Sequence, residues 1–406
     1  MSRLARSRTH HQKTRWIVLR FISVALAYGL FLASCSSATS TPLSTGTLVP
    51  PTALSATGTP PATPTVGALI GNTIPSTRID DRLNTLVERL PLAGLAVGIH
   101  FRDELYEQGY GLADLESGEP VKATTAFKIA SLTKSFTAAA ILRLVEEGRL
   151  SLDDPITRFI PGTPAYAEEI LVRHLLDHTS GLPEWSVDTA QEALPEAFST
   201  PEAIEYYFRS TAQLEFQPGK SWSYNNVGYF LLGAIIENVT GMSYADYLRA
   251  AFFEPLEMHF TYDCADTREG LPSGYHSRAT GLETVRPSNL RFLGAAGALC
   301  SNVGDLLKWL EALSSRKVIS PEAWEQMVTS TQLPSGETTD YGLGFVVQQA
   351  DQGTVILHEG ATAGFNSYFA YYPEHDLYLV LLTNTDSFDP DLRTIASLIV
   401  DMTLRK

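Results

Sequence analysis

The chain has 406 residues, of which 44% are hydrophobic and 18% charged, with 29 glycines and 23 prolines. This composition excludes a wholly disordered chain, a collagen-like repeat and a long coiled coil, and three cysteines exclude a disulfide-dense scaffold or a multi-site zinc protein. Residues 78–406 hold 24 basic and 45 acidic side chains, a net charge of −21 that repels phosphate and argues against nucleic-acid binding.

The N-terminus has the pattern of an export signal. Residues 1–20 carry six Lys or Arg side chains and no acid, and an apolar run of 14 residues follows. That run is shorter than the roughly 20 residues needed to cross a bilayer. It ends in Leu32-Ala33-Ser34-Cys35, which resembles the lipobox of bacterial lipoproteins and implies a signal peptide over 1–34 and a lipid on Cys35. The alternatives are an ordinary signal with an incidental cysteine, or a short uncleaved anchor.

Residues 35–77 are predicted to form a disordered tether. Residues 36–77 contain 24 Ser, Thr or Pro among 42 positions and no charged side chain. Such a segment cannot bury enough apolar surface to fold, and its prolines keep it extended. We therefore expect one folded domain, residues 78–406, lipid-anchored to a bacterial membrane outside the cytoplasm.

The folded domain is predicted to start with a helix and two strands. Residues 78–90 have apolar side chains at helical spacing, and residues 93–112 alternate in the manner of two joined strands. A further helix is expected over 131–148, ended by Gly148. From about 150 to 330 the pattern is mostly helical and rich in loops.

The C-terminal part is predicted to return to strands. Four runs after Tyr341 (GLGFVVQQ, TVILHEG, NSYFAYYP and LYLVLLTN) are separated by short turns, which favours antiparallel neighbours, and a helix is expected over about 390–404. Strands at both ends with helices between them predict an α/β (α+β) fold. One antiparallel sheet would combine the N- and C-terminal strands, flanked by helices, with a mostly helical second lobe over about 150–330. A small-molecule site is expected between the two.

The sequence FKIASLTK holds the strongest candidate for catalysis. Ser131 stands at an expected helix N-terminus and Lys134 follows three positions later, so both side chains lie on one face, one turn apart. A serine hydroxyl needs a neighbouring base to become a good nucleophile, and burial can lower the pKa of a lysine enough to supply one. A bare S-x-x-K also occurs by chance at exposed helix starts, but the apolar residues 136–144 indicate a buried helix.

Two further motifs carry polar residues suited to a hydrolase. Tyr224 and Asn226 stand two apart at an expected helix start, where a phenol can relay a proton and an amide can hold a substrate carbonyl. Alternatively, they are turn and cap residues. His358 and Gly360 are expected to end a strand, where glycine permits close approach of substrate and the amide of Ala361 can join an oxyanion hole. Alternatively, the histidine is a hydrogen-bonded turn residue.

Together these motifs resemble the signature set of the penicillin-recognising serine hydrolases, which include class C β-lactamases, D-alanyl-D-alanine carboxypeptidases and family VIII esterases. The resemblance covers about 90–400, with supporting stretches such as HLLDHTSGLP, and it implies the β-lactamase/transpeptidase-like fold. The matching residues are Ser131 and Lys134 for S-x-x-K, Tyr224 and Asn226 for Y-x-N, and His358, Glu359 and Gly360 for K-T-G or H-x-G.

The resemblance also implies a role for each residue. Ser131 would be acylated, and Lys134 and Tyr224 would form the proton-transfer pair, with the identity of the base left open. The backbone amides of Ser131 and Ala361 would form the oxyanion hole, and water would then release the acyl group. The residues that would bind substrate are Asn226, His358, Gly360 and Ala361.

One position departs from the classical β-lactamase pattern. Those enzymes have lysine in the third motif, where a fixed positive charge meets the substrate carboxylate, whereas this chain has His358. An unperturbed histidine, with a pKa of about 6.5, is mostly neutral at pH 7. Glu359 adds a neighbouring negative charge and the domain is acidic. We therefore expect neutral esters, amides or amidated peptides to be better substrates than penicillins.

Two cysteines and two histidines with possible structural roles lie outside these motifs. Cys264 and Cys300 are predicted to form a disulfide in an exported domain, the alternative being two buried thiols. His174 and His178 are spaced like a metal pair, but no third ligand is nearby and the resemblance implies a structural stretch, so neither a metal nor a cofactor is expected.

The leading hypothesis is therefore a membrane-tethered serine hydrolase, expected to be a monomer, that hydrolyses ester or amide bonds through an acyl-enzyme. Its substrate would be a small molecule or peptide: a cell-wall peptide, an ester or a β-lactam. The alternatives are a true β-lactamase or D-alanyl-D-alanine carboxypeptidase, and a non-catalytic penicillin-binding sensor.

Overall fold

The computed structural model describes residues 73–185, 193–195, 197–265, 270–286 and 289–405. They lie within one compact unit, Val66–Lys406. The predicted signal peptide, Cys35 and the tether up to residue 72 lie outside the described residues. Within the described ranges, no helix combines the length and the apolar character needed to cross a membrane.

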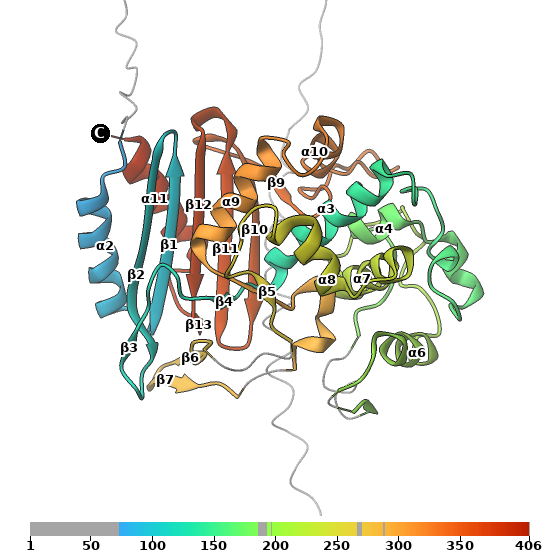
Figure 1. Ribbon diagram of the computed structural model, residues 1–406, viewed down its shortest axis with the longest axis horizontal. Helices are drawn as coiled ribbons and strands as arrows, with labels where there is room; N and C mark the ends of the chain where they lie inside the picture. Colours follow the sequence, from blue (N-terminus) through green and yellow to red (C-terminus); the bar gives the residue numbers. More distant parts are fainter. Residues whose placement is uncertain (1–72, 186–192, 196, 266–269, 287–288, 406) are drawn as a thin grey trace, which may run out of the picture. The chain divides into compact units, whose positions relative to one another are not determined.

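A seven-stranded antiparallel sheet forms the framework of the domain, in the order β3-β2-β1-β12-β11-β10-β9 (Figure 1). The first and last parts of the chain meet at its centre, because β1 pairs with β12 from Leu95↔Thr383 to Phe101↔Leu377. The predicted antiparallel sheet built from both ends of the domain is thus confirmed. Its strands are β1 (Gly94–Phe101), β2 (Glu104–Asp114), β3 (Glu119–Pro120), β9 (Val346–Ala350), β10 (Gly353–Thr362), β11 (Phe365–Tyr372) and β12 (Leu377–Thr383).

Helices cover both faces of this sheet. The terminal helices α2 (Ser76–Arg89) and α11 (Leu392–Leu404) pack on one face, against alternate residues of β1 and β12. On the other face, α9 (Val303–Ser314) packs directly against β1 and β12. The helix approaches the strand closely at Gly98, where a Cβ would lie 3.0 Å from Val303 and Leu307 side-chain atoms and would push α9 outward by a few tenths of an ångström. The alternation of strand side chains divides the apolar core into two layers.

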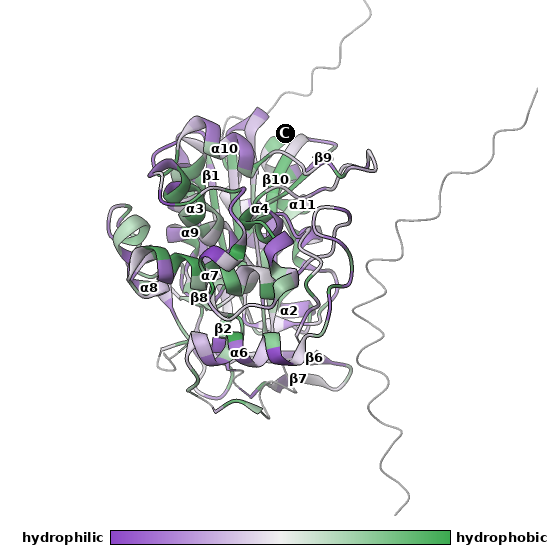
Figure 2. Cartoon of the chain, turned by 90° about the vertical axis from the view of Figure 1, so that its right-hand side faces the viewer, coloured by the Kyte–Doolittle hydropathy of each residue, from purple (hydrophilic) through white to green (hydrophobic). Residues whose placement is uncertain are grey.

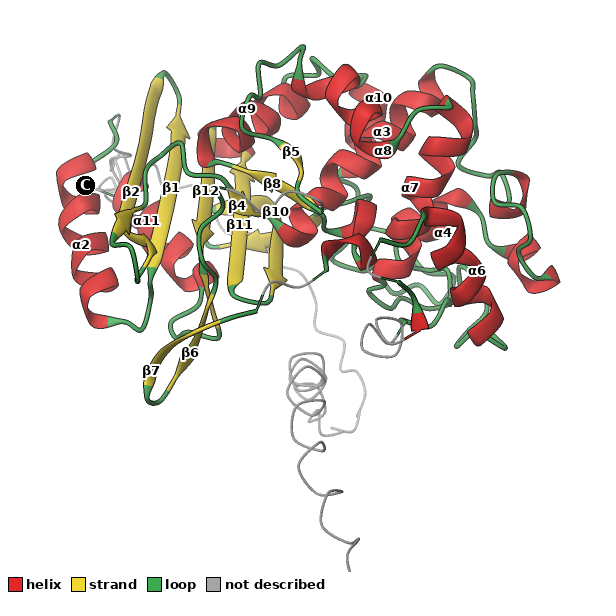
Figure 3. Cartoon of the chain, turned by 60° about the horizontal axis from the view of Figure 1, so that its bottom comes forward, coloured by secondary structure: helices red, strands yellow, loops and turns green. Residues whose placement is uncertain are grey.

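The remaining helices gather into a second lobe beside the sheet (Figure 3). The helix α3 lies at the junction and is buried almost throughout, as its apolar sequence predicts. In Figure 2, α6 carries both hydrophilic and hydrophobic residues, as expected for a helix with one buried face. These helices are α3 (Thr133–Glu146), α4 (Val172–Leu176), α6 (Thr200–Ser210), α7 (Asn226–Thr240), α8 (Tyr244–Leu248) and α10 (Pro321–Met327).

Two small three-stranded sheets complete the domain. One consists of β4 (Phe127–Lys128), β8 (Leu299–Ser301) and β5 (Tyr262–Asp263), and the other of β13 (Thr385–Asp386), β6 (Tyr275–Arg278) and β7 (Gly281–Thr284). The β4-β8-β5 sheet bears on function because β4 runs into the 3-10 turn η1 (Ala130–Leu132), which carries Ser131.

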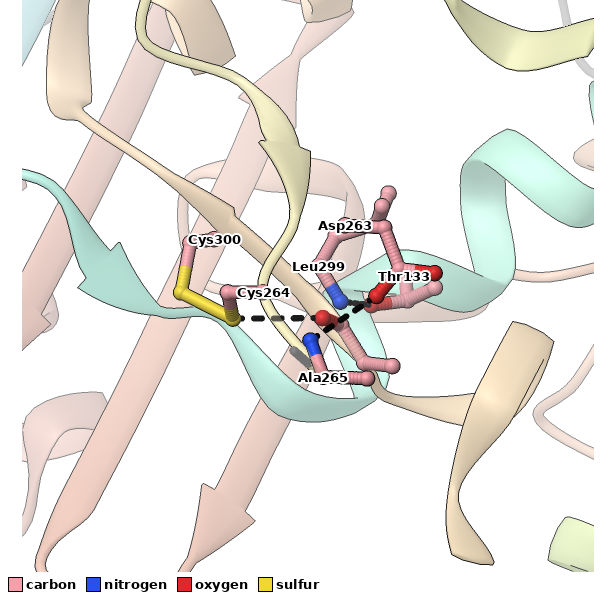
Figure 4. The surroundings of a disulfide bond; sticks show 7 residues. Thr133, Asp263, Cys264, Ala265, Leu299 and Cys300 are labelled. Carbon is pink, nitrogen blue, oxygen red and sulfur yellow. Dashed lines mark hydrogen bonds between the residues drawn. A yellow bond between two sulfur atoms is a disulfide. The ribbon is translucent and has the colours of Figure 1, made fainter. Parts of the chain in front are cut away.

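Cys264 and Cys300 form a disulfide beside this small sheet, with a Cα–Cα distance of 5.6 Å. Figure 4 shows it next to Leu299 and Thr133, where the Leu299 N–H donates to the Thr133 hydroxyl at 3.3 Å. The cross-link therefore braces the strand that pairs with β4, immediately before Ser131.

The boundaries of some elements differ from the sequence-based expectation. The folded part begins before residue 78, because α2 starts at Ser76 and the Ile74 N–H donates to Glu104 Oε2 at 2.6 Å. The strand β10 continues to Thr362, so His358 and Gly360 lie inside a strand and do not end it. The pairing of Thr362 with Phe365 accounts for this extension.

Candidate active site

Ser131 lies on η1, where this turn contacts β10 and β11. The residue before it, Ala130, has φ +45°, a conformation that non-glycine residues rarely adopt and that is often found at functional sites. The local chain is held from the sheet side, since the Ser367 hydroxyl donates to the Ile129 carbonyl at 2.7 Å. The geometry fixes the serine between the sheet and the helical lobe.

Lys134 is fully buried one turn later and meets Ser131 directly. Its Nζ donates to Ser131 Oγ at 3.0 Å, to Asn226 Oδ1 at 2.8 Å and to the Ala296 carbonyl at 2.9 Å. An ammonium group has three protons and finds three acceptors here. When the amine is neutral, one of these contacts can reverse, and the Ser131 hydroxyl can then donate to Nζ.

The environment of Lys134 lets its amine lose a proton near neutral pH, so that the Ser131 hydroxyl can donate to Nζ. Burial lowers the pKa of Lys134 to about 7, and the negative charge of Glu184 opposes the fall only in part. A neutral amine is therefore accessible at physiological pH. A base of this pKa beside a serine hydroxyl has the arrangement required for nucleophilic catalysis.

Tyr224 and Asn226 reach the same point from the start of α7. Asn225 is the N-cap of this helix and accepts from the Gly228 N–H at 2.7 Å, which fixes the two residues on either side of it. Lys134 Nζ lies 4.9 Å from the centroid of the Tyr224 ring. Burial raises the pKa of Tyr224 although 37% of the residue is exposed, while contact with Ser131 acts in the opposite direction. The phenol therefore keeps its proton at neutral pH.

Glu184 is a site residue that the sequence motifs did not reveal. Its Oε2 accepts from the Asn226 N–H at 2.6 Å, and its charge acts on Lys134. Desolvation by its neighbours raises the pKa of Glu184 although the residue is exposed at the surface, whereas the hydrogen bond from Asn226 and the charge of Lys134 lower it. The only sequence signal was its position directly after the HTSGLP stretch. Glu184 therefore places a carboxyl group beside the reacting residues.

His358 reaches the site from the middle of β10. It is buried, its Nδ1 donates to the Glu359 carbonyl at 2.7 Å, and its Nε2 accepts from the Tyr341 hydroxyl at 2.9 Å. Burial and the charge of Lys134 lower the pKa of His358 to about 3. The imidazole is therefore neutral, as the sequence argument expected, and supplies no cation for a substrate carboxylate.

Glu359 does not act on the site in the way that the sequence suggested. Neighbouring residues of a strand point to opposite faces, and Glu359 forms an ion pair with Arg393 of α11, at 2.5 Å between Oε2 and Nη2. The negative charge of Glu359 is thus neutralised by Arg393 and does not act on Ser131. The negative group near the reacting residues is Glu184 instead.

Gly360 provides the close approach that its position requires. A Cβ built there would lie 2.5 Å from the Ile129 carbonyl oxygen and 3.0 Å from the Ser131 amide nitrogen. Any side chain would therefore force β10 away from η1. Ala361 follows in the same strand, paired with Asn366, so the two amides expected to form the oxyanion hole come from neighbouring segments.

The histidine pair HxxxH does not assemble a metal site. His174 Nδ1 accepts from the Leu171 N–H, whereas His178 packs among tyrosine rings near the active site. Among the described residues, no group of three His, Cys, Asp or Glu side chains is placed to hold a metal ion.

Comparison with known proteins agrees with the fold and the motifs. Residues 79–402 match the family model described as Beta-lactamase. The chain belongs to the Beta-lactamase family. Within it, the chain is 31% identical over 323 residues to penicillin-binding protein 4* of Bacillus subtilis (strain 168), covering 74% of this chain and 70% of that protein. It is 30% identical over 322 residues to esterase EstB of Burkholderia gladioli, covering 69% and 79%.

Among solved structures, D-amino acid amidase from Ochrobactrum anthropi SV3, complexed with D-phenylalanine, has a TM-score of 0.69 to this chain. It is 26% identical, and the match covers 81% of this chain and 97% of that one. These similarities make the protein a serine hydrolase of the Beta-lactamase family. They also confirm the predicted fold, with its antiparallel sheet and helical lobe.

Proposed function

We propose that this protein is an extracytoplasmic, lipid-tethered serine hydrolase that cleaves ester and amide bonds through an acyl-enzyme on Ser131. The observation that carries the proposal is the contact of a buried lysine, whose pKa is lowered to about 7, with the serine hydroxyl. Similarity to an esterase and to an amidase supports both bond types.

In the acylation step, the neutral amine of Lys134 removes the proton of the Ser131 hydroxyl, and Oγ attacks the substrate carbonyl carbon. The amides of Ser131 and Ala361 stabilise the resulting oxyanion. Collapse of this intermediate breaks the bond to the leaving group. The leaving oxygen or nitrogen takes a proton from the Tyr224 phenol, which recovers one from the Lys134 ammonium.

In the deacylation step, water attacks the acyl carbon and gives a proton to the same pair, releasing the acid and restoring the Ser131 hydroxyl. The raised pKa of Tyr224 favours Lys134 as the base and Tyr224 as the proton donor. This division of roles addresses the choice that the sequence left open.

The charges around the site favour substrates without a free carboxylate. His358 is neutral where classical β-lactamases carry a lysine, and the Glu184 carboxyl lies beside Asn226. A substrate carboxylate would meet no fixed cation from these residues and would be repelled by ionised Glu184. Neutral esters and amides, and substrates with an ammonium group, avoid this penalty.

The test is turnover of p-nitrophenyl butyrate and nitrocefin by the full chain, with Ser131→Ala as the control. We expect ester hydrolysis by the wild type, none by the variant, and slower turnover of nitrocefin, which carries a carboxylate. Equal activity of wild type and variant would refute the serine mechanism. Stable acylation without turnover would favour a penicillin-binding sensor, and faster nitrocefin hydrolysis would favour a β-lactamase.

The tether is tested separately by cell fractionation. The lipobox-like pattern at Cys35 supports a lipid anchor. We expect the wild-type chain in the membrane fraction and Cys35→Ser in a soluble fraction. Membrane retention of the variant would argue for an uncleaved anchor.

A further inference from the structure

His178 is a buried residue that the mechanism above does not use. It follows α4, is fully buried and has φ +63°. A non-glycine residue is strained in this left-handed region, and glycine would adopt the conformation more easily. The chain nevertheless places an imidazole there. Backbone strain of this kind is concentrated at functional sites of proteins.

The hydrogen bonds of His178 hold both neighbours of Tyr224. Its carbonyl accepts from the Ser223 N–H at 3.0 Å, and its Nδ1 accepts from the Asn225 N–H at 3.1 Å. One residue thus fixes the backbone immediately before and immediately after the tyrosine. Because Nδ1 is the acceptor, the neutral ring carries its proton on Nε2.

The imidazole ring also packs against the Tyr224 side chain. Their centroids are 4.4 Å apart, and the rings of Tyr341 and Tyr229 lie 4.6 and 5.2 Å from the histidine. Tyr341 is the residue that donates to His358. His178 therefore packs against the Tyr224 ring and also contacts Tyr341, which binds His358 of β10.

The turn that presents His178 is itself fixed. The Thr179 N–H donates to the His174 carbonyl at 3.0 Å, and the Thr179 hydroxyl donates to Asp177 Oδ1 at 2.6 Å. These contacts keep the imidazole in place at a backbone conformation that is otherwise unfavourable. The support for Tyr224 is thus rigid and does not depend on an exposed loop.

We propose that His178 is a positioning residue for Tyr224: its Nδ1 acceptor and ring set the phenol at the distance needed to protonate the leaving group. This inference rests on the proposed function, in which Tyr224 is the proton donor. Misplacing a proton donor affects the chemical step more than substrate binding. Loss of this support therefore lowers kcat and leaves KM nearly unchanged.

Two substitutions separate the acceptor from the ring. His178→Phe keeps an aromatic ring but loses the Nδ1 acceptor, whereas His178→Asn offers an amide oxygen near the Nδ1 position and tolerates positive φ. With an amide substrate, a p-nitroanilide, and the full chain, we expect His178→Phe to lower kcat roughly 10- to 100-fold with KM changed less than twofold. An amide is the probe because its leaving nitrogen must take a proton, whereas p-nitrophenolate departs without one. His178→Asn should recover most of kcat.

His174→Asn and His174→Phe are the matched controls. His174 also accepts a backbone N–H, that of Leu171 at 3.2 Å, but this bond lies within α4 and its N-cap and does not flank Tyr224. We expect both control variants to keep kcat within twofold. Thermal unfolding of all four variants shows which of them are folded.

Wild-type kcat in His178→Phe, with Tyr224→Phe inactive, overturns the positioning role and leaves the proposed function intact. Equal loss in His178→Phe and His178→Asn overturns the role of the Nδ1 acceptor. If His178→Phe does not fold, His178→Ala, which also lacks the acceptor, replaces it: a tenfold or larger loss of kcat that His178→Asn recovers supports the proposal, and wild-type kcat in His178→Ala overturns it. Full activity of Tyr224→Phe would instead refute its role as donor, and this inference with it.

Discussion

The start of α3 and the middle of β10 each bring one buried basic residue to the site, and burial has different consequences for the two. Lys134 falls to a pKa of about 7, where it exchanges protons at physiological pH. His358 falls to about 3 and remains a neutral hydrogen-bonding group. The same desolvation thus creates a base on the helical side and removes a charge on the strand side, because the two groups start from different pKa values.

The largest expected effect comes from deleting the base. Lys134→Ala should lower kcat on p-nitrophenyl butyrate roughly 1,000-fold, because it removes the amine that contacts the Ser131 hydroxyl and accepts its proton. His358→Ala should lower kcat far less, roughly tenfold, since His358 is a neutral hydrogen-bonding group in the site. A larger loss of kcat in His358→Ala than in Lys134→Ala would show that His358 contributes more to catalysis than Lys134 does. Steady-state kinetics of the two variants measure it.

The second prediction concerns substrate choice. His358→Lys should raise the kcat/KM ratio of nitrocefin to p-nitrophenyl butyrate roughly tenfold, because a charge-assisted hydrogen bond to a carboxylate is worth about 1.5–3 kcal/mol. His358→Gln, which adds no charge, is the matched control. An unchanged ratio in the lysine variant would show that the third motif does not contact the carboxylate.

The pH dependence of activity should follow Lys134. Its neutral form is the base, so kcat/KM should rise with pH through about 7 and gain roughly tenfold between pH 6 and pH 8. The same group destabilises the fold most below its native pKa, where the buried charge must be kept, and this penalty is relieved as pH rises toward 10.5. An activity profile flat across pH 6 to 8 would contradict Lys134 as the base.

The smallest expected effect is on acid stability. His358 is protonated below pH 6.5 in the unfolded chain but only near pH 3 in the native state, so the native state loses stability as pH falls between these values. His358→Gln cannot titrate and should show a shallower decline in urea midpoint from pH 7 to pH 4. Parallel declines in the two proteins would mean that other groups, such as His178, carry the acid sensitivity.

Much of this arrangement could be predicted from the sequence, because it depends on local patterns. Spacing alone predicted that Ser131 and Lys134 share one face, and the order of elements, with strands at both ends of the domain, predicted that the β1 and β12 segments share one sheet. Glu184, Tyr341 and the ion pair of Glu359 with Arg393 were missed. Each depends on contacts between segments distant in sequence, which carry no local periodicity.

The disulfide between Cys264 and Cys300 makes the support of the nucleophile sensitive to redox conditions. It closes a loop with a sequence separation of 36, worth about 3–4 kcal/mol in the chain-entropy treatment. Thiols stay reduced in most cytosols and oxidise after export. A reduced chain would hold β5 and β8 together by backbone pairing and by the hydrogen bond between the Thr261 and Ser301 hydroxyls, next to the strand that leads into Ser131. Oxidation adds a covalent link to this support, so the reduced chain should hold the nucleophile less firmly than the oxidised one.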